Sequence, residues 1–166
     1  MAVHDVTEDH VASGSTGQRR GRAIAMSDDE LDGFLAEERT CRIATLGEDG
    51  CPHVSPLWFV WHDSSLWLNS VVRSQRWRDV ERNPRVSVVI DSGNDFTELR
   101  GVELTGEALP IGEVPRSATR DDELSEPERL FGAKYGGGTF YADGRHAWLR
   151  IRPAKIVSWD FRKMGR

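Results

Sequence analysis

Short segments in which apolar and polar residues alternate recur along most of this 166-residue chain. In RVSVVID the apolar Val86, Val88 and Ile90 share one parity, and in GVELTGEAL apolar side chains alternate with Glu103 and Glu107. A period of two is typical of strands that bury one face and expose the other. No regular series of long helices separates these segments, which excludes a doubly wound parallel fold. The pattern favours a small antiparallel barrel with helical additions.

About seven strands and three helices are predicted. Residues 39–70 read as a meander of three strands, with turns at residues 48–50 and 62–65. The closing segment HAWLRIRPAKIVSWDF is expected to form two further strands, broken near Pro153 because proline cannot donate to a sheet. Capping residues and apolar spacing place the helices at residues 27–38, 74–82 and 126–135.

Length and charge indicate one domain over residues 26–166, preceded by a mobile tail over residues 1–25 that lacks apolar periodicity. The net charge of −5 argues against a nucleic-acid partner, which requires a broad basic surface. The longest apolar run, Pro56 to Trp61, is far shorter than the roughly 20 residues of a membrane-spanning helix, so no membrane partner is expected. Two cysteines and no apolar leader predict a cytoplasmic protein.

The strand around Leu57 to Trp61 is apolar on both faces, with Trp58 and Val60 on the side opposite Phe59. A small barrel has only one interior. The outward face is therefore expected to be covered by a partner or a ligand.

A cluster of positive charge follows this meander. Five arginines lie between Arg73 and Arg85, together with Asp79 and Glu81, which gives this segment a net charge of +3 in an acidic chain. The segment is either a solvated helix whose arginines pair with those two acids or a site that holds an anion.

The first helical turn of this segment favours the anion. Ser74 is a good N-cap, yet Arg76 follows it where acids are usually found, and a cation at a helix N-terminus is unfavourable. An external phosphate would reverse the sign of that interaction. Ser70, Ser74 and Arg76 provide suitable donors for it. No spacing of His, Cys and acidic residues predicts a metal site, and no catalytic side chain is predicted.

The order of these features resembles the pyridoxamine 5′-phosphate oxidase-like split-barrel family, which includes flavin and deazaflavin oxidoreductases. The resemblance rests on ATLGEDGCPHVSPLWF, LWLNSVVRSQRWRDVERNPRVSVVI and the late KIVSWDF. It implies a mainly β fold, an antiparallel split barrel of six to seven strands with short helices. It further implies a homodimer with FMN or the deazaflavin F420 at the subunit interface.

The resemblance also implies site residues. The hydroxyl and basic residues that would hold the cofactor phosphate are Ser70, Ser74, Gln75 and Arg76. The strand that would line the ring, largely through its backbone, consists of Val54, Ser55, Pro56 and Leu57. Trp159 would either stack near the ring bound to the other subunit or belong to the core.

Two departures narrow the expected function. Gln75-Arg76 stands where many flavin-binding members carry a basic pair, and the Arg-Leu-x-Pro ending of the true pyridoxamine phosphate oxidases is absent. The SWD ending looks more like the deazaflavin branch. The expected function is hydride transfer between the bound cofactor and a small organic substrate, without vitamin conversion. The alternative is a non-catalytic split barrel that stores or senses a flavin or haem.

Overall fold

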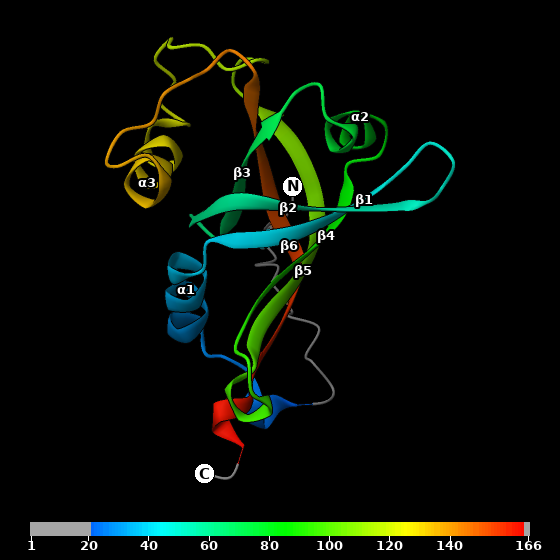
Figure 1. Ribbon diagram of the computed structural model, residues 1–166, viewed down its shortest axis with the longest axis vertical. Coiled ribbons are helices and arrows are strands. Elements are labelled where there is room, and N and C mark those ends of the chain that lie inside the picture. Colours follow the sequence, from blue (N-terminus) through cyan, green and yellow to red (C-terminus); the bar gives the residue numbers. More distant parts are fainter. Residues whose placement is uncertain (1–20, 165–166) are drawn as a thin grey trace, which may run out of the picture.

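The computed structural model describes residues 21–164 and shows one closed antiparallel sheet of six strands (Figure 1). The strands follow the order β1-β2-β3-β6-β5-β4, and pairing of β1 with β4 closes the barrel. This confirms the predicted mainly β, antiparallel fold. The strands are β1 (Thr40–Leu46), β2 (Pro52–His62), β3 (Ser65–Val71), β4 (Arg85–Ser92), β5 (Arg100–Ile111) and β6 (His146–Asp160).

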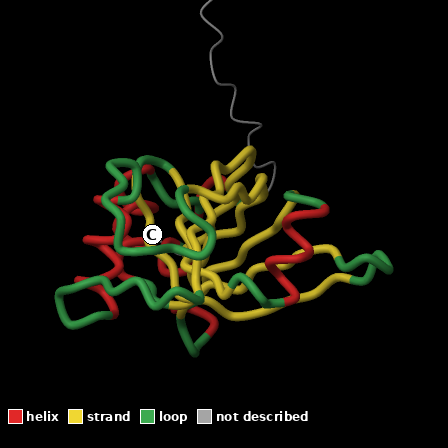
Figure 2. Tube along the Cα trace, turned by 90° about the horizontal axis from the view of Figure 1, so that it is seen from above, coloured by secondary structure: helices red, strands yellow, loops and turns green. Residues whose placement is uncertain are grey.

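Three α-helices lie at the periphery of the barrel, and the turn between β1 and β2 projects away from it (Figure 2). Helices α1 and α3 both contact β2, whereas α2 contacts β1. All three occur where the sequence predicts them, and short 3₁₀ helices complete the fold. The helices are α1 (Asp28–Glu37), α2 (Gln75–Arg82), α3 (Ser125–Tyr135), η1 (Arg22–Ile24), η2 (Phe96–Glu98) and η3 (Phe161–Lys163).

The start of α1 shows how local sequence fixes an element. The Ser27 hydroxyl accepts from the Glu30 backbone N–H, and the Glu30 carboxylate accepts from the Ser27 N–H, which is a capping box. One turn later, Phe34 and Leu35 are buried against the barrel. A capped helix with one apolar face thus seals one side of the sheet.

Strand β6 corrects one prediction. It runs without a break for 15 residues, so the expected interruption near Pro153 is wrong, and six strands form instead of seven. The register with β5 shifts between Thr105 and Gly106, which pair with Lys155 and Pro153 respectively, so Ala154 is an extra residue on β6. A β-bulge of this kind absorbs a residue that cannot donate while the strand continues.

The outward face of β2 is partly covered by the same chain. Val60 is 2% exposed and packs in a second apolar cluster with Trp67, Leu124 and Trp148, which α3 overlies. The expectation that this face needs a partner or ligand is therefore wrong for Val60. Trp58 remains 53% exposed. A homodimer stays a prediction.

The predicted tail covers residues 1–25, of which residues 1–20 lie outside the described residues. Arg22–Ile24 forms η1, and just beyond it Lys163 Nζ donates to the Ala25 carbonyl over 2.7 Å, while the Met26 N–H donates to Ser158 Oγ over 3.0 Å. These bonds hold the start of the domain to the end of β6. Across residues 21–164, no helix has the length and apolar character needed to span a membrane.

We expect Gly101→Ala to destabilise the fold by about 1–3 kcal/mol, because a Cβ there would lie 2.4 Å from the Trp159 ring. Gly33→Ala is the matched control: it lies on α1 with no atom within 4 Å of a new Cβ, and helix propensity predicts a gain of about 0.5–1 kcal/mol. Urea unfolding of both variants measures the difference. A Gly101→Ala protein as stable as the parent would contradict the observed packing of Trp159.

Candidate functional site

Strands β2 and β3 separate part-way along their length. They pair from Phe59 to His62 on β2, whereas residues 52–58 of β2 pair with β1 alone among the described strands. The edge of β2 that faces β3 therefore has no ladder partner along residues 54–57, the segment predicted to line a cofactor ring. Backbone N–H and C=O groups at such an edge are available to a ligand.

Arg76 bridges this split. Its Nη1 donates to Ser55 Oγ on β2 over 2.6 Å, and its Nε and Nη2 donate to Ser70 Oγ on β3, each over 3.2 Å. Ser70 is fully buried and Arg76 is 7% exposed. Three of the five guanidinium N–H groups thus donate to hydroxyls, and the other two have no hydrogen-bond partner among the described residues.

The charge of Arg76 has no carboxylate partner in the part of the chain that the structure describes. Burial lowers the pKa of Arg76, the direction that disfavours its cation. The other buried arginine, Arg116, is 4% exposed but places its Nε 2.6 Å from Glu128 Oε1. A buried cation is costly unless an anion compensates it. The contrast marks Arg76 as a buried cation that no carboxylate among the described residues compensates.

The first turn of α2 is also distinctive. It contains no acidic residue, whereas the first turns of α1 and α3 contain acids that complement the helix dipole. The Ser74 hydroxyl accepts from the Trp77 N–H over 3.2 Å and caps the helix as predicted. The Ser74 oxygen is therefore already used as the cap of α2, whereas the hydroxyl proton is still available to a ligand.

Gln75 lies apart from this cluster. Its Nε2 donates to Asp79 Oδ1 over 2.7 Å, and its Oε1 accepts from Arg78. The exposed Gln75 instead borders a cavity of about 530 Å³ beside the β1–β2 turn and His53. The structure thus brings together Ser55, Ser70 and Arg76, and directs Gln75 elsewhere.

The alternative reading of the segment, that its arginines pair with Asp79 and Glu81, holds for one residue. Arg82 Nη2 lies 2.9 Å from Asp79 Oδ1, while Glu81 accepts from the indole of Trp77. Arg76 takes no part in these pairs. The charge cluster is therefore a helix surface at Arg82 and a buried, uncompensated cation at Arg76.

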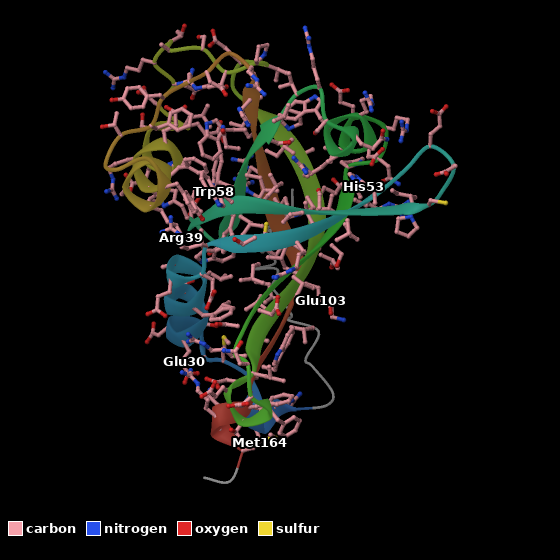
Figure 3. The ribbon with its side chains drawn as sticks, viewed as in Figure 1. Glu30, Arg39, His53, Trp58, Glu103 and Met164 are labelled. Carbon is pink, nitrogen blue, oxygen red and sulfur yellow. The ribbon has the colours of Figure 1, made fainter. Side chains whose placement is uncertain are left out.

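The four residues predicted to line a ring alternate along β2. Val54 and Pro56 are exposed, whereas Ser55 and Leu57 are half-buried. Pro56 and Leu57 border a cavity of about 550 Å³ between β2, β3 and the segment that follows α3. Figure 3 shows Trp58, which also lines this cavity, on β2 close to α3, and His53 toward the opposite end of the strand near α2.

The sequence reasoning missed the far wall of this cavity. Trp58 stacks on Tyr135 with ring centroids 4.6 Å apart and planes 5° apart, and Asn69 of β3 contributes an amide. A signal was present for Asn69: it sits between Leu68 and Ser70, so strand alternation points it outward. Nothing in the sequence indicated that the chain after α3 would return to it.

Trp159 lies far from the Arg76 cluster within one chain. It pairs with Gly101 near the end of β6, whereas His146 at the start of β6 pairs with Val71. The ring is half-buried over Gly101. Its predicted stacking on a cofactor bound to the other subunit stays a prediction.

Residues 27–160 match the family described as pyridoxamine 5′-phosphate oxidase. This chain belongs to the pyridoxamine 5′-phosphate oxidase family. The split between β2 and β3 and the Arg76 bridge are thus features of a family member, and the resemblance inferred from sequence is confirmed.

Three known proteins resemble this chain in sequence or in fold. The chain is 27% identical over 134 residues to the 5a,11a-dehydrotetracycline/5a,11a-dehydrooxytetracycline reductase of Streptomyces rimosus, covering 76% of this chain and 78% of the reductase. The crystal structure of the conserved hypothetical protein Rv2991 from Mycobacterium tuberculosis is 29% identical, with a TM-score of 0.76 over 91% of this chain and 94% of that one. A structure named F420 reductase shares the fold at 19% identity, with a TM-score of 0.56 over 76% and 94%.

The environment of Asp79, a buried residue of α2 close to Arg76, predicts that the stability of the fold depends on pH. Burial alone raises its pKa, but hydrogen bonds from Thr45, Gln75 and Arg82 outweigh this and hold the pKa below its usual value. A carboxyl whose pKa is lowered by folding stabilises the protein above its unfolded pKa, and this contribution is lost as pH falls through the folded value. We expect the free energy of unfolding to fall as pH drops below about 4, the ordinary pKa of an aspartate, and Asp79→Asn to flatten this decline.

Asp91→Asn is the control for this experiment, because Asp91 is an exposed partner of Arg42. The free energy of unfolding of the Asp91→Asn protein should decline toward low pH as it does in the parent, because an exposed ion pair contributes little to stability. An Asp79→Asn protein that declines as steeply as the parent would contradict the account of Asp79.

Proposed function

We propose that this protein is an oxidoreductase that binds a flavin-type cofactor, FMN or the deazaflavin F420, and transfers hydride between it and a small organic molecule. The observation that carries the proposal is the buried Arg76 cation, which bridges Ser55 and Ser70 across the split and has no carboxylate partner among the described residues. A phosphate of the cofactor supplies the missing charge.

The residues around Arg76 fit a phosphate. The two guanidinium N–H groups that are not spent on serines, the Ser74 hydroxyl proton and the acid-free first turn of α2 all offer positive partial charge. Gln75 would reach the phosphate only if its bond to Asp79 breaks. We therefore assign the anchor to Ser70, Ser74 and Arg76, with Gln75 as a peripheral residue.

The unpaired edge of β2 fits the ring. Along residues 54–57 the backbone presents donors and acceptors toward the split, and the planar ring of either cofactor carries matching groups on its pyrimidine edge. Backbone groups hold a ring in place without being selective between a flavin and a deazaflavin. This is consistent with a family that uses both.

The bound cofactor supplies the hydride chemistry, so the protein needs no side chain that reacts. The task of Arg76 is to neutralise the phosphate and fix the depth of binding. The task of residues 54–57 is to orient the ring and polarise its edge. The exposed Trp58 and Val54 extend the same surface, which we propose is completed by a second subunit in a homodimer.

The curated relative from Streptomyces rimosus supports reduction of a substrate as the direction of the reaction, since its name describes a reductase of dehydrotetracyclines. A non-catalytic store for a flavin or haem is the competing function. Absorbance and mass spectra of what copurifies from a host that makes FMN and F420 identify the cofactor. Reduction of the bound cofactor followed by reoxidation with conjugated acceptors then separates the two: no acceptor-dependent turnover would favour the store.

We expect Arg76→Met to weaken cofactor binding by about 1.5–3 kcal/mol, roughly 10- to 150-fold, because a charge-assisted anchor is lost. Cofactor titration by fluorescence quenching measures this. The free energy of unfolding of the apoprotein should change by less than about 1 kcal/mol, because the substitution also removes an uncompensated buried charge.

The matched control is Arg78→Ala, two residues along α2, whose exposed guanidinium donates to Gln75. It should bind cofactor as the parent does. If Arg76→Met and Arg78→Ala bind the cofactor with equal affinity, Arg76 does not hold the cofactor phosphate. A large loss of apoprotein stability in Arg76→Met alone would assign Arg76 a structural role instead.

A further inference from the structure

We propose that the cavity between β2, β3 and the segment after α3 binds a flat, neutral, conjugated ketone, and that this ligand is the molecule to be reduced. The inference rests on the proposed function, whose site shares Pro56 and Leu57 with this cavity. Its volume of about 550 Å³ falls in the range of cavities that enclose drug-sized molecules.

The cavity is lined mainly by rings. One wall is the stacked pair of Trp58 and Tyr135, and Phe131 meets both rings, with centroids 6.2 Å and 4.7 Å away. Phe140 lies edge-on to Phe131 at 5.9 Å. Tyr135 covers one face of the Trp58 indole, yet Trp58 is still 53% exposed. Its remaining surface can receive a second flat molecule by the same offset stacking.

The polar groups of the cavity disfavour an anion as the ligand. None of its lining residues is a lysine or an arginine. The Asp143 carboxylate lies among them and is held in its charged form: burial raises its pKa, but hydrogen bonds from Arg145 and His146 outweigh burial and lower it. Asp143 Oδ2 also lies 2.8 Å from His146 Nδ1. A phosphate or carboxylate would therefore meet a like charge here, unlike at Arg76.

Asn69 selects for an oxygen acceptor. Its Nδ2 is buried and has no hydrogen-bond partner among residues 21–164. An unsatisfied buried donor costs about 1–3 kcal/mol, so an acceptor supplied by a ligand would recover that cost. Asn69 lines the cavity and no hydrogen bond within the described chain fixes its amide, so a rotation of this side chain would present the N–H to a carbonyl oxygen there. A ketone supplies that acceptor without adding charge.

The position of the cavity relates this ligand to the proposed cofactor. Pro56 and Leu57 belong both to the cavity wall and to the ring-facing edge of β2. A flat molecule stacked on Trp58 would therefore lie beside the ring that supplies hydride. Hydride from the reduced cofactor would form a C–H bond at the β-carbon of the conjugated ketone, the C=C electrons would move onto the carbonyl oxygen as an enolate, and a proton from water would complete the saturated ketone while the cofactor is left oxidised. The aromatic side chains provide affinity, and Asn69 provides orientation.

The test uses two probes of the same shape, 9-fluorenone and fluorene, which differ by one carbonyl oxygen. Titrated into the apoprotein by calorimetry, 9-fluorenone should bind about tenfold more tightly than fluorene, the value of one hydrogen bond. Asn69→Leu should bind the two equally. Trp58→Ala should weaken both by a similar factor, and 9-fluorenone-2-carboxylate should bind the parent less tightly than 9-fluorenone.

Asn94→Leu is the matched control, since Asn94 is exposed on the loop after β4 and should leave the preference intact. Circular dichroism confirms that each variant is folded before titration. Equal affinities of the parent for both probes, or a preference that survives Asn69→Leu, would overturn the proposal. The measurement needs no cofactor, so failure here leaves the Arg76 anchor standing, and failure of that anchor leaves these affinities unchanged.

Discussion

The site depends on one unusual interaction: a buried guanidinium that two serine hydroxyls hold across a gap in the sheet. Ser55 and Ser70 are neutral acceptors, so they orient Arg76 without neutralising it. Within residues 21–164 the other buried arginine, Arg116, lies against the Glu128 carboxylate. The fold thus maintains a positive charge at the point where β2 and β3 part. A carboxylate of the same chain beside Arg76 would make folding more favourable, but it would leave no uncompensated positive charge to attract a ligand.

The rest of the domain supports that arrangement. Helix α2 is short because Ser74 caps its start and Asn83 with Pro84 ends it. Arg76 is the second residue of the helix, which lets its guanidinium reach back to Ser70 near the end of β3. Asp79 ties the helix to β1 through Thr45. Phe59 of β2 and Leu68 of β3 are buried in the same apolar core as the alternating residues of β4 and β5, so both strands of the split pack against one interior.

Local sequence patterns predicted most of the fold. The capping box at Ser27, the alternation in β4 and the Asn-Pro stop after α2 act over a few residues, so they can be recognised directly. Pro153 was misjudged because a bulge is a property of two strands, and only the register with Gly106 reveals it. The Arg76 cluster was partly predictable because Arg76 and Ser70 lie close in sequence, whereas the contact of Arg76 with Ser55 spans 21 residues.

The barrel and residues 112–147 form different parts of the site, and this affects how such a protein can evolve. Strands β5 and β6 form a hairpin whose last pair is Ile111 and Trp148, so residues 112–147 form one long connection with fixed ends. This connection contains α3 and most of the aromatic residues that line the cavity. Lengthening a loop whose ends are already fixed adds little entropic cost, about 0.6 kcal/mol per doubling. New ligand preferences can thus evolve in residues 112–147 while the Arg76 cluster, built from β2, β3 and α2, is inherited intact.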